Sequence, residues 1–126
     1  MKKTSMILCG MMLLASSAMA QVKVIAHRGH WNSQGAAQNS IAAMQNAKKA
    51  DVWGSEFDVH ITTDGTVVVN HDDDIHGIII ENAKYADIKN LKLANGEPIA
   101  TLKSYLEAGK KLAPMQLILE VKAHQT

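Results

Sequence analysis

Val24-Ile25-Ala26-His27-Arg28-Gly29 is the stretch from which the fold of this chain can be worked out. The apolar, largely β-branched run from Val22 to Ala26 predicts a strand buried on both faces of a parallel sheet. This strand delivers a histidine, an arginine and a glycine at its carboxyl end. Apolar residues at helical spacing then predict a helix over Ile41 to Lys49, with Asn39 or Ser40 as its N-cap. A strand followed by a helix indicates a βα unit.

Three further strand patterns also lead into ionisable residues. They cover Trp53 to Ile61, Val67 to Asn70 and Gln116 to Val121. Alternation along the first of them places Glu56 and Asp58 on one face. Strands that end at the same edge of a sheet bring such groups together, which predicts one polar site. The site's other members from these strands are His71, Glu120 and Lys122.

Thr63-Asp64-Gly65-Thr66 is a turn signal between the second and third strands. If Asp64-Gly65 forms a two-residue turn, the two strands are antiparallel and Asp58 faces His71. If the chain instead returns along the sheet before rising again in parallel, His71 still ends beside Asp58. The sequence leaves both paths open. Later in the chain it predicts a short helix over Ala83 to Leu91, and a helix from Leu102 to Ala108 that Gly109 terminates.

Residues 1–20 have the pattern of a secretory signal peptide. Lys2 and Lys3 precede an apolar stretch, and Ala18-Met19-Ala20 is a small-x-small cleavage signal before Gln21. The apolar core is shorter than the ~20 residues that a membrane span needs. We therefore expect export across the inner membrane to the periplasm or the extracellular space, with no integral membrane span after cleavage.

The composition of the predicted mature part, 21–126, excludes several classes of site. The single cysteine, Cys9, lies in the signal peptide, so neither a disulfide framework nor a thiolate metal site is expected. Loss of Lys2 and Lys3 leaves 11 basic against 12 acidic residues, which changes the formal charge from +1 to −1. This balance gives no reason to expect nucleic acid as a partner.

The acidic residues predict a site for a hard divalent metal. Glu56 and Asp58 share one strand face, and carboxylates that close raise each other's pKa unless a cation lies between them. Ca²⁺ or Mg²⁺ is the usual solution, with Glu120 as a third ligand. Zinc is disfavoured because the set is rich in oxygen and no His-x-x-x-His helix is present. The alternative for an isolated Glu-x-Asp pair is a solvated polar face.

The remaining groups indicate phosphate chemistry. His27 and His71 could form a general acid and base pair, since imidazole titrates near neutral pH. Arg28 could bind a phosphate through two hydrogen bonds, and Lys122 could neutralise developing negative charge. The alternative for both cations is a salt bridge to Glu120 or Glu56. Together these residues suit phosphoryl transfer better than peptide or glycoside hydrolysis.

In ordered combination these motifs resemble the glycerophosphodiester phosphodiesterase family. The resemblance implies an α/β fold of the TIM-type (β/α) barrel kind, of which 21–126 would be the N-terminal half with about four strands. A full barrel takes ~250 residues and eight strands. The matching segments are Ala26-His27-Arg28-Gly29, Gln38-Asn39-Ser40-Ile41, Glu56 to Asp72, and Leu119-Glu120-Val121-Lys122.

The resemblance also implies a reaction, the hydrolysis of glycerophosphodiesters to glycerol 3-phosphate and an alcohol. By position, Glu56, Asp58 and Glu120 would bind the divalent metal, Ca²⁺ or Mg²⁺. His27 and His71 would be the catalytic acid and base, and Arg28 and Lys122 would bind the substrate phosphate. The sequence departs from the family's usual Pro-Glu-Asn-Thr, since Gln38 replaces the acidic residue in Ala37-Gln38-Asn39-Ser40.

Two alternatives to this function remain open. One is a non-catalytic half-barrel that binds metal or phosphate and self-associates. The other is a phospholipase-D-like phosphodiesterase that acts on lipid rather than on deacylated substrate.

Overall fold

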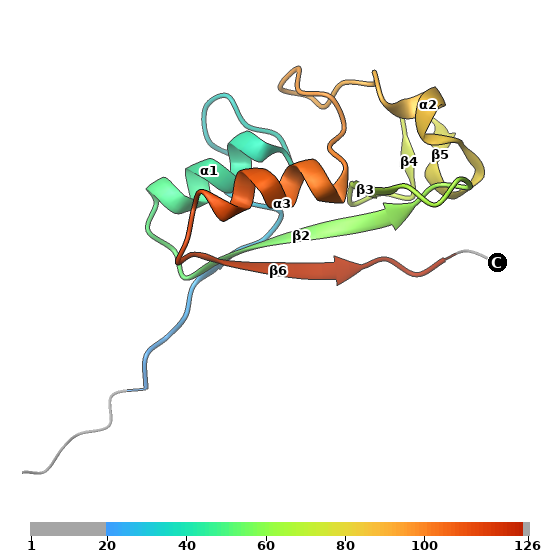
Figure 1. The fold of residues 1–126 in the computed structure, drawn as a ribbon. Helices are drawn as coiled ribbons and strands as arrows, with labels where there is room; N and C mark the ends of the chain where they lie inside the picture. Colours follow the sequence, from blue (N-terminus) through green and yellow to red (C-terminus); the bar gives the residue numbers. More distant parts are fainter. Residues whose placement is uncertain (1–19, 125–126) are drawn as a thin grey trace, which may run out of the picture.

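A computed structural model describes residues 20–124 of the chain. The predicted signal peptide, 1–20, lies outside the described residues except for Ala20. Helices α1 and α3 cover one face of a sheet built around the long strand β2 (Figure 1). The elements in chain order are β1 (Ile25–Ala26), α1 (Ile41–Lys49), β2 (Gly54–Ile61), β3 (Val67–Val69), β4 (Asp74–Ile75), β5 (Ile78–Ile79), the 3-10 helix η1 (Ile80–Asn82), α2 (Tyr85–Ile88), α3 (Leu102–Lys110) and β6 (Gln116–Val121).

Strand β2 is the centre of the four-stranded sheet. The short strand β1 pairs in parallel with its beginning, and β3 pairs antiparallel with its end. Strand β6 runs parallel along its other side, with Asp58 opposite Glu120. Because β2 has neighbours on both edges and helices over one face, its residues from Gly54 to Val59 are all buried.

The turn between β2 and β3 resolves the two paths that the sequence left open. The strands form an antiparallel hairpin, which is the first of these paths, but its turn does not have the two residues that this path assumed. Val59 pairs with Val69, and the Thr62 N–H donates to the Thr66 carbonyl at 2.9 Å, so the connection contains three residues. Gly65 takes the left-handed φ of 82° that such a turn requires. This one-residue shift places Asn70, not His71, opposite Asp58, and the Asn70 N–H donates to the Asp58 carbonyl at 3.0 Å.

The first strand is shorter and more exposed than predicted. Only Ile25 and Ala26 pair with β2, whereas Val24 is 57% exposed and Val22 is 90% exposed. Within residues 20–124, β1 has no strand on its other edge. The apolar run therefore lacks the neighbours that would bury both of its faces.

Helix α1 has the predicted bounds, and Ser40 is its N-cap. The other two helices differ from the prediction. Helix α2 is limited to Tyr85–Ile88, and α3 continues to Lys110 with Gly109 inside it. Gly109 is buried where α3 crosses Leu117 of β6 and Met44 of α1, so the absence of a side chain allows close packing and does not end the helix.

The apolar core lies between β2 and the two long helices. Phe57 and Tyr105 pack with ring centroids 4.5 Å apart, and Met44 and Ala47 of α1 are fully buried beside them.

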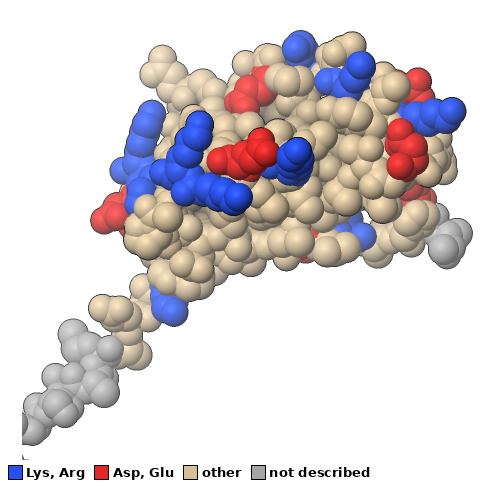
Figure 2. Space-filling model, in the orientation of Figure 1, with Lys and Arg blue, Asp and Glu red and all other residues tan. Residues whose placement is uncertain are grey.

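Basic side chains gather on the helical face of the molecule, at the end where α1 and α3 terminate (Figure 2). Lys48, Lys49 and Lys110 occupy the last turns of these helices, where cations interact favourably with the helix dipole. In the described part of the chain, no helix is both long enough and apolar enough to cross a membrane.

Candidate active site

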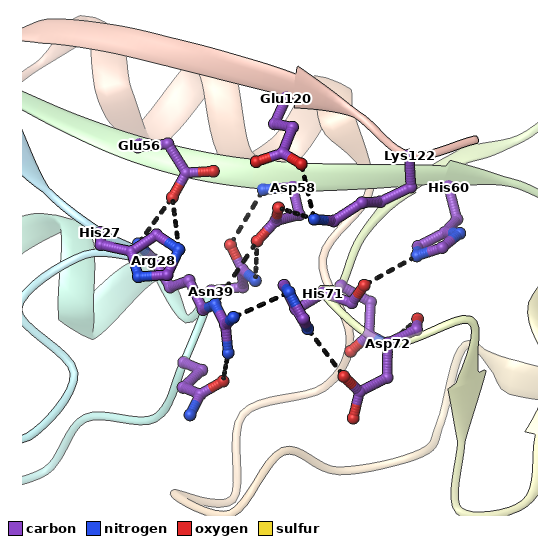
Figure 3. A network of polar contacts seen from close by, with 12 residues as sticks. His27, Arg28, Asn39, Glu56, Asp58, His60, His71, Asp72, Glu120 and Lys122 are labelled. Atoms are coloured by element: carbon purple, nitrogen blue, oxygen red, sulfur yellow. Dashed lines mark hydrogen bonds and ion pairs between the residues drawn. The ribbon is translucent and has the colours of Figure 1, made fainter.

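All seven residues predicted for the site gather at the carboxyl end of the parallel strands (Figure 3). His27 and Arg28 follow β1, while Glu56 and Asp58 lie on β2. His71 comes shortly after β3. The last two, Glu120 and Lys122, lie at the end of β6 and just beyond it. The structure therefore brings together groups from four segments of the chain.

The three acidic residues form a compact oxygen cluster. One carboxylate oxygen from each of Glu56, Asp58 and Glu120 lies within 4.8 Å of the other two. Pairing of Asp58 with Glu120 across β2 and β6 produces this closeness. The Oε1 atom of Glu56 is buried without a hydrogen-bond partner, a costly arrangement that a cation would relieve. A set of three carboxylates fits a hard ion such as Ca²⁺ or Mg²⁺.

Burial raises the pKa of Glu56, and the neighbouring carboxylates of Asp58 and Glu120 raise it further. Two influences, each weaker than burial, oppose this shift. The backbone N–H of Arg28 donates to Glu56 Oε2 at 2.8 Å, and the His27 ring lies 3.9 Å from the same oxygen. Burial is thus the main reason why the charged form of Glu56 is disfavoured, and the two neighbouring carboxylates add to it.

Asp58 differs from Glu56 because it is fully buried yet well paired. Burial alone would raise its pKa, but hydrogen bonds from Asn39 and Lys122 outweigh burial, so the pKa of Asp58 is lowered. The Lys122 ammonium lies 3.0 Å from Asp58 Oδ1 and 2.7 Å from Glu120 Oε1. The hydrogen bond to Glu120 and the contacts with Asp58 raise the pKa of Lys122, although partial desolvation opposes them. Lys122 thus stays charged between two members of the acidic cluster.

Arg28 lies at the centre of the hydrogen-bond network. Its Nη1 donates to Gln38 Oε1 at 2.7 Å, and its Nη2 lies 2.8 Å from His71 Nε2. Its backbone has a φ of 58° and is followed by Gly29 at 78°, which turns the chain sharply after β1. Any side chain at position 29 would collide with Ala43 of α1. The turn therefore depends on glycine at this position and directs Arg28 into the site.

His71 is held by two neighbours that set the proton on its ring. Arginine can only donate, so the Arg28 guanidinium makes His71 Nε2 the acceptor. The proton of the neutral ring then lies on Nδ1 and is donated to Asp72 Oδ1, 2.7 Å away. His71 consequently has an unprotonated Nε2 directed at the site, whereas the side chain of His27 is 68% exposed at the other end of the cluster. The arrangement can accept a proton at one end and donate one at the other.

Asn39, expected from its sequence position only as a possible helix cap, belongs to the site. The Asn39 side chain is buried and makes two hydrogen bonds to Asp58. Its Nδ2 donates to Asp58 Oδ2 at 3.0 Å, and its Oδ1 accepts the Asp58 backbone N–H at 3.1 Å. Its φ is 59°, a left-handed value that asparagine tolerates better than most residues. The location of Asn39 in a family-like segment was the only signal. Gln38, Asp72 and His60, whose Nε2 lies 3.0 Å from the His71 carbonyl, also went unassigned.

Comparison with known proteins relates this geometry to one family. A profile described as the glycerophosphoryl diester phosphodiesterase family matches residues 27–124. A curated relative, the glycerophosphodiester phosphodiesterase of Caldanaerobacter subterraneus, is 44% identical over 52 residues, which are 41% of this chain and 21% of that protein. Human lysophospholipase D GDPD1 is 37% identical over 71 residues, 56% of this chain and 22% of that protein.

Two solved structures extend the comparison to the fold. A glycerophosphodiester phosphodiesterase from Parabacteroides distasonis is 50% identical with a TM-score of 0.81, over 82% of this chain and 44% of that one. A phosphodiesterase from Oleispira antarctica, in complex with the product sn-glycerol-3-phosphate, is 31% identical with a TM-score of 0.69, over 80% of this chain and 44% of that one. The chain thus spans less than half the length of either structure.

These structural relatives are TIM-type barrels, which confirms the predicted fold class, an α/β chain that forms part of such a barrel. Three of the four sheet strands, β1, β2 and β6, run in parallel as a barrel requires. Strand β3 is the antiparallel arm of the hairpin.

Proposed function

Because the chain belongs to the glycerophosphoryl diester phosphodiesterase family, we propose that it carries a metal-dependent site that hydrolyses glycerophosphodiesters to glycerol 3-phosphate and an alcohol. The family consists of phosphoric diester hydrolases. One observation carries the proposal, namely the convergence of three carboxylates, two cations and two histidines within the segment that the family profile matches.

Glu56, Asp58 and Glu120 are the proposed metal ligands, because their oxygens converge and Glu56 Oε1 is buried without a partner. A divalent ion, Ca²⁺ or Mg²⁺, supplies Lewis-acid stabilisation of negative charge on phosphate when bound. Burial raises the pKa of Glu56, and a cation at this position would favour its ionised carboxylate.

Arg28 and Lys122 are the proposed phosphate ligands. The Arg28 guanidinium is held beside the cluster by Gln38 and His71, and the Lys122 ammonium is held by Asp58 and Glu120. Both cations therefore face the same space from opposite sides (Figure 3). A phosphodiester carries one negative charge, which two fixed cations can bind and orient.

The two histidines are the proposed proton carriers. A glycerol hydroxyl of the substrate forms a new bond to phosphorus and loses its proton to His71 Nε2, while the bond from phosphorus to the leaving alcohol breaks and His27 gives the alcohol oxygen its proton. Water then forms a bond to phosphorus of the resulting cyclic phosphate and loses a proton to His27, while the ring P–O bond breaks and its oxygen takes the proton from His71, which yields glycerol 3-phosphate. The support for these roles is the unprotonated Nε2 of His71, set by Asp72, and the accessible position of His27.

The comparisons support the proposed class of substrate. The Oleispira structure holds sn-glycerol-3-phosphate as product, and it resembles 80% of this chain. A second candidate is a lysophospholipase D activity on lipid substrates, which the similarity to human lysophospholipase D GDPD1 favours. Both candidates use the same phosphodiester chemistry and differ in the group attached to the glycerol.

Release of glycerol 3-phosphate from glycerophosphocholine and glycerophosphoethanolamine tests the proposal. We expect turnover that a chelator abolishes and that Ca²⁺ or Mg²⁺ restores, with a loss of roughly 100-fold or more in His27→Ala and His71→Ala. His30→Ala, which changes an exposed histidine, is the matched control. Turnover that survives both metal removal and His27→Ala contradicts the proposal. Faster turnover of lysophosphatidylcholine would select the second candidate instead.

Metal binding without turnover of any of these substrates would favour the non-catalytic, self-associating half-barrel. Light scattering would then show whether the chain forms a dimer. We also propose export through the signal peptide at 1–20 to the periplasm or the extracellular space. Cell fractionation followed by N-terminal sequencing tests this, and the expected mature terminus is Gln21.

A further inference from the structure

We propose that Glu97, which lies outside the acidic cluster, is a positioning residue that acts through helix α1 and Asn39 to orient the carboxylate of Asp58. The inference rests on the proposed metal site, of which Asp58 is a member. The sequence predicts only a turn at Asn95-Gly96-Glu97-Pro98, so neither the motif nor the proposed chemistry assigns Glu97 a role.

Glu97 binds the free amino end of α1. Its Oε1 accepts the Ile41 N–H at 3.0 Å, and its Oε2 accepts the Ala42 N–H at 3.2 Å. The first turn of α1 contains no acidic residue of its own. The Ser40 hydroxyl accepts the N–H of Ala43 in the helix and that of Ala37 before it, so it leaves the N–H groups of Ile41 and Ala42 to another acceptor. A carboxylate from a segment more than fifty residues away in sequence therefore satisfies two of the backbone donors that every helix leaves unpaired.

The Glu97 carboxylate is itself held in place. The Asn95 side-chain amide donates to Glu97 Oε2 and also to the Gly35 carbonyl, the latter at 3.1 Å. The Asn95 Oδ1 accepts the Glu97 backbone N–H at 3.2 Å, and Gly96 takes the φ of 87° that closes the turn. The turn thus contacts both the start of α1 and the loop that leads into it.

The anchored end of α1 is also the end that bears Asn39. Ser40 is the N-cap, and Asn39 precedes it with a left-handed backbone whose N–H donates to the Arg28 carbonyl at 3.0 Å. From this position the Asn39 amide brackets Asp58, because Nδ2 donates to Oδ2 and Oδ1 accepts the backbone N–H. A shift in the first turn of α1 therefore moves the group that holds Asp58.

The hydrogen bond to Oδ2 orients the other oxygen of Asp58. With Oδ2 bound to Asn39, Oδ1 points toward Lys122 and the rest of the cluster. Without that bond the buried carboxylate could rotate and lose its alignment with Glu56 and Glu120. Mutation of residues that hydrogen-bond to metal ligands, without binding the metal themselves, commonly changes metal affinity by roughly 10–100-fold.

Two measurements on the whole chain test the role of Glu97. The first is the NMR signal of the Asn39 side-chain amide in metal-free protein, which reports its hydrogen bond to Asp58. The second is the dissociation constant for Mg²⁺ and Ca²⁺ from calorimetry, measured well below the unfolding temperature. The variants are Glu97→Ala, which removes both acceptors, and Glu97→Gln, which keeps one amide oxygen and loses the charge. Glu107→Ala, at an exposed position on α3, is the control.

In Glu97→Ala we expect a shifted Asn39 amide signal and roughly tenfold weaker metal binding. In Glu97→Gln both changes should be smaller and in the same direction. Glu107→Ala should show neither change. If Glu97→Ala does not fold, Glu97→Gln decides by the same two readings. A lowered unfolding temperature with an unchanged Asn39 signal and unchanged metal affinity shows that Glu97 only stabilises the fold, and this overturns the proposal. If the wild-type chain binds neither metal, the proposed metal site fails, and the Asn39 signal alone still decides whether Glu97 positions that amide.

Discussion

Replacing Asn39 with glycine would remove the hydrogen bonds that hold Asp58 without adding backbone strain. Asn39 is 1% exposed and Asp58 is fully buried, and two hydrogen bonds of 3.0 and 3.1 Å join them. Loss of the hydrogen bond to the charged carboxylate lowers the free energy of unfolding by about 1.5–3 kcal/mol. The buried backbone N–H of Asp58, left without an acceptor, lowers it by about 1–3 kcal/mol. Glycine adopts the φ of 59° readily, which offsets part of this loss. We expect the free energy of unfolding to fall by about 3 kcal/mol.

Urea unfolding of the metal-free protein near neutral pH measures this loss. With an m-value of about 1.5 kcal/mol per M, the midpoint should fall by about 2 M. Asn90→Gly makes the same chemical change at an exposed position and should alter the free energy of unfolding by less than about 1 kcal/mol. A loss in Asn39→Gly no larger than that in Asn90→Gly would refute the reasoning.

The difference in free energy of unfolding between wild type and Asn39→Gly should also depend on pH, which gives a second test. The folded-state pKa of Asp58 lies below its ordinary value of 3.8, because the bonds from Asn39 and Lys122 outweigh burial. Its contribution to stability is therefore complete above that ordinary value and is lost as the pH falls through the folded-state pKa. The gap between wild type and Asn39→Gly should narrow as the pH is lowered below about 4. A gap that stays constant on acidification would show that the lost stability does not come from the ionised Asp58.

Three further substitutions have expected outcomes. Gly29→Ala should lower the free energy of unfolding, measured by thermal unfolding, by about 2–4 kcal/mol. Its Cβ would lie 2.6 Å from the Cβ of Ala43, and the backbone φ of 78° disfavours any side chain. The control Gly65→Ala, at a left-handed position with open space around it, should lower the free energy of unfolding by only about 1 kcal/mol. Lys122→Met should tighten the binding of Mg²⁺ and Ca²⁺ measured by calorimetry, because it removes the ammonium that pairs with Asp58 and Glu120. Turnover should fall, since a proposed phosphate ligand is lost. Weaker metal binding would show that the ammonium does not compete with the ion. Glu56→Gln should raise the free energy of unfolding of the metal-free protein near neutral pH, because burial and nearby carboxylates raise the pKa of Glu56 and so disfavour its charged form in the folded state. This gain in stability should shrink as the pH falls through the raised pKa, where wild-type Glu56 becomes neutral. A variant less stable than wild type near neutral pH would contradict this.

The polar ends of the strands could be predicted because they follow from local pattern. Alternation along β2 placed Glu56 and Asp58 on one face, and β6 has the predicted bounds of Gln116–Val121. The rule that parallel strands end at one edge of a sheet then predicted the grouping of Glu120 and Lys122 with these acids. Those expectations needed only periodicities of two and a common strand direction.

The errors arose where the outcome depended on neighbours rather than on local pattern. The β2–β3 register shifted by one residue because the turn contains three residues instead of two. Gly109 lies inside α3 because Leu117 and Met44 pack against it, although glycine commonly ends helices. The run from Val22 to Val24 stayed exposed because β1 pairs on one edge only.

By itself the sequence determined which side chains lie at the strand ends, and the ordered motifs that carry them were enough to indicate the family. Only the tertiary structure decided what orients those side chains. Asn39 reaches Asp58 across 19 residues of sequence, and Glu97 reaches Ile41 across 56. Contacts of this kind depend on how separate elements pack against one another, and hydrophobic periodicity within a single element does not encode that packing.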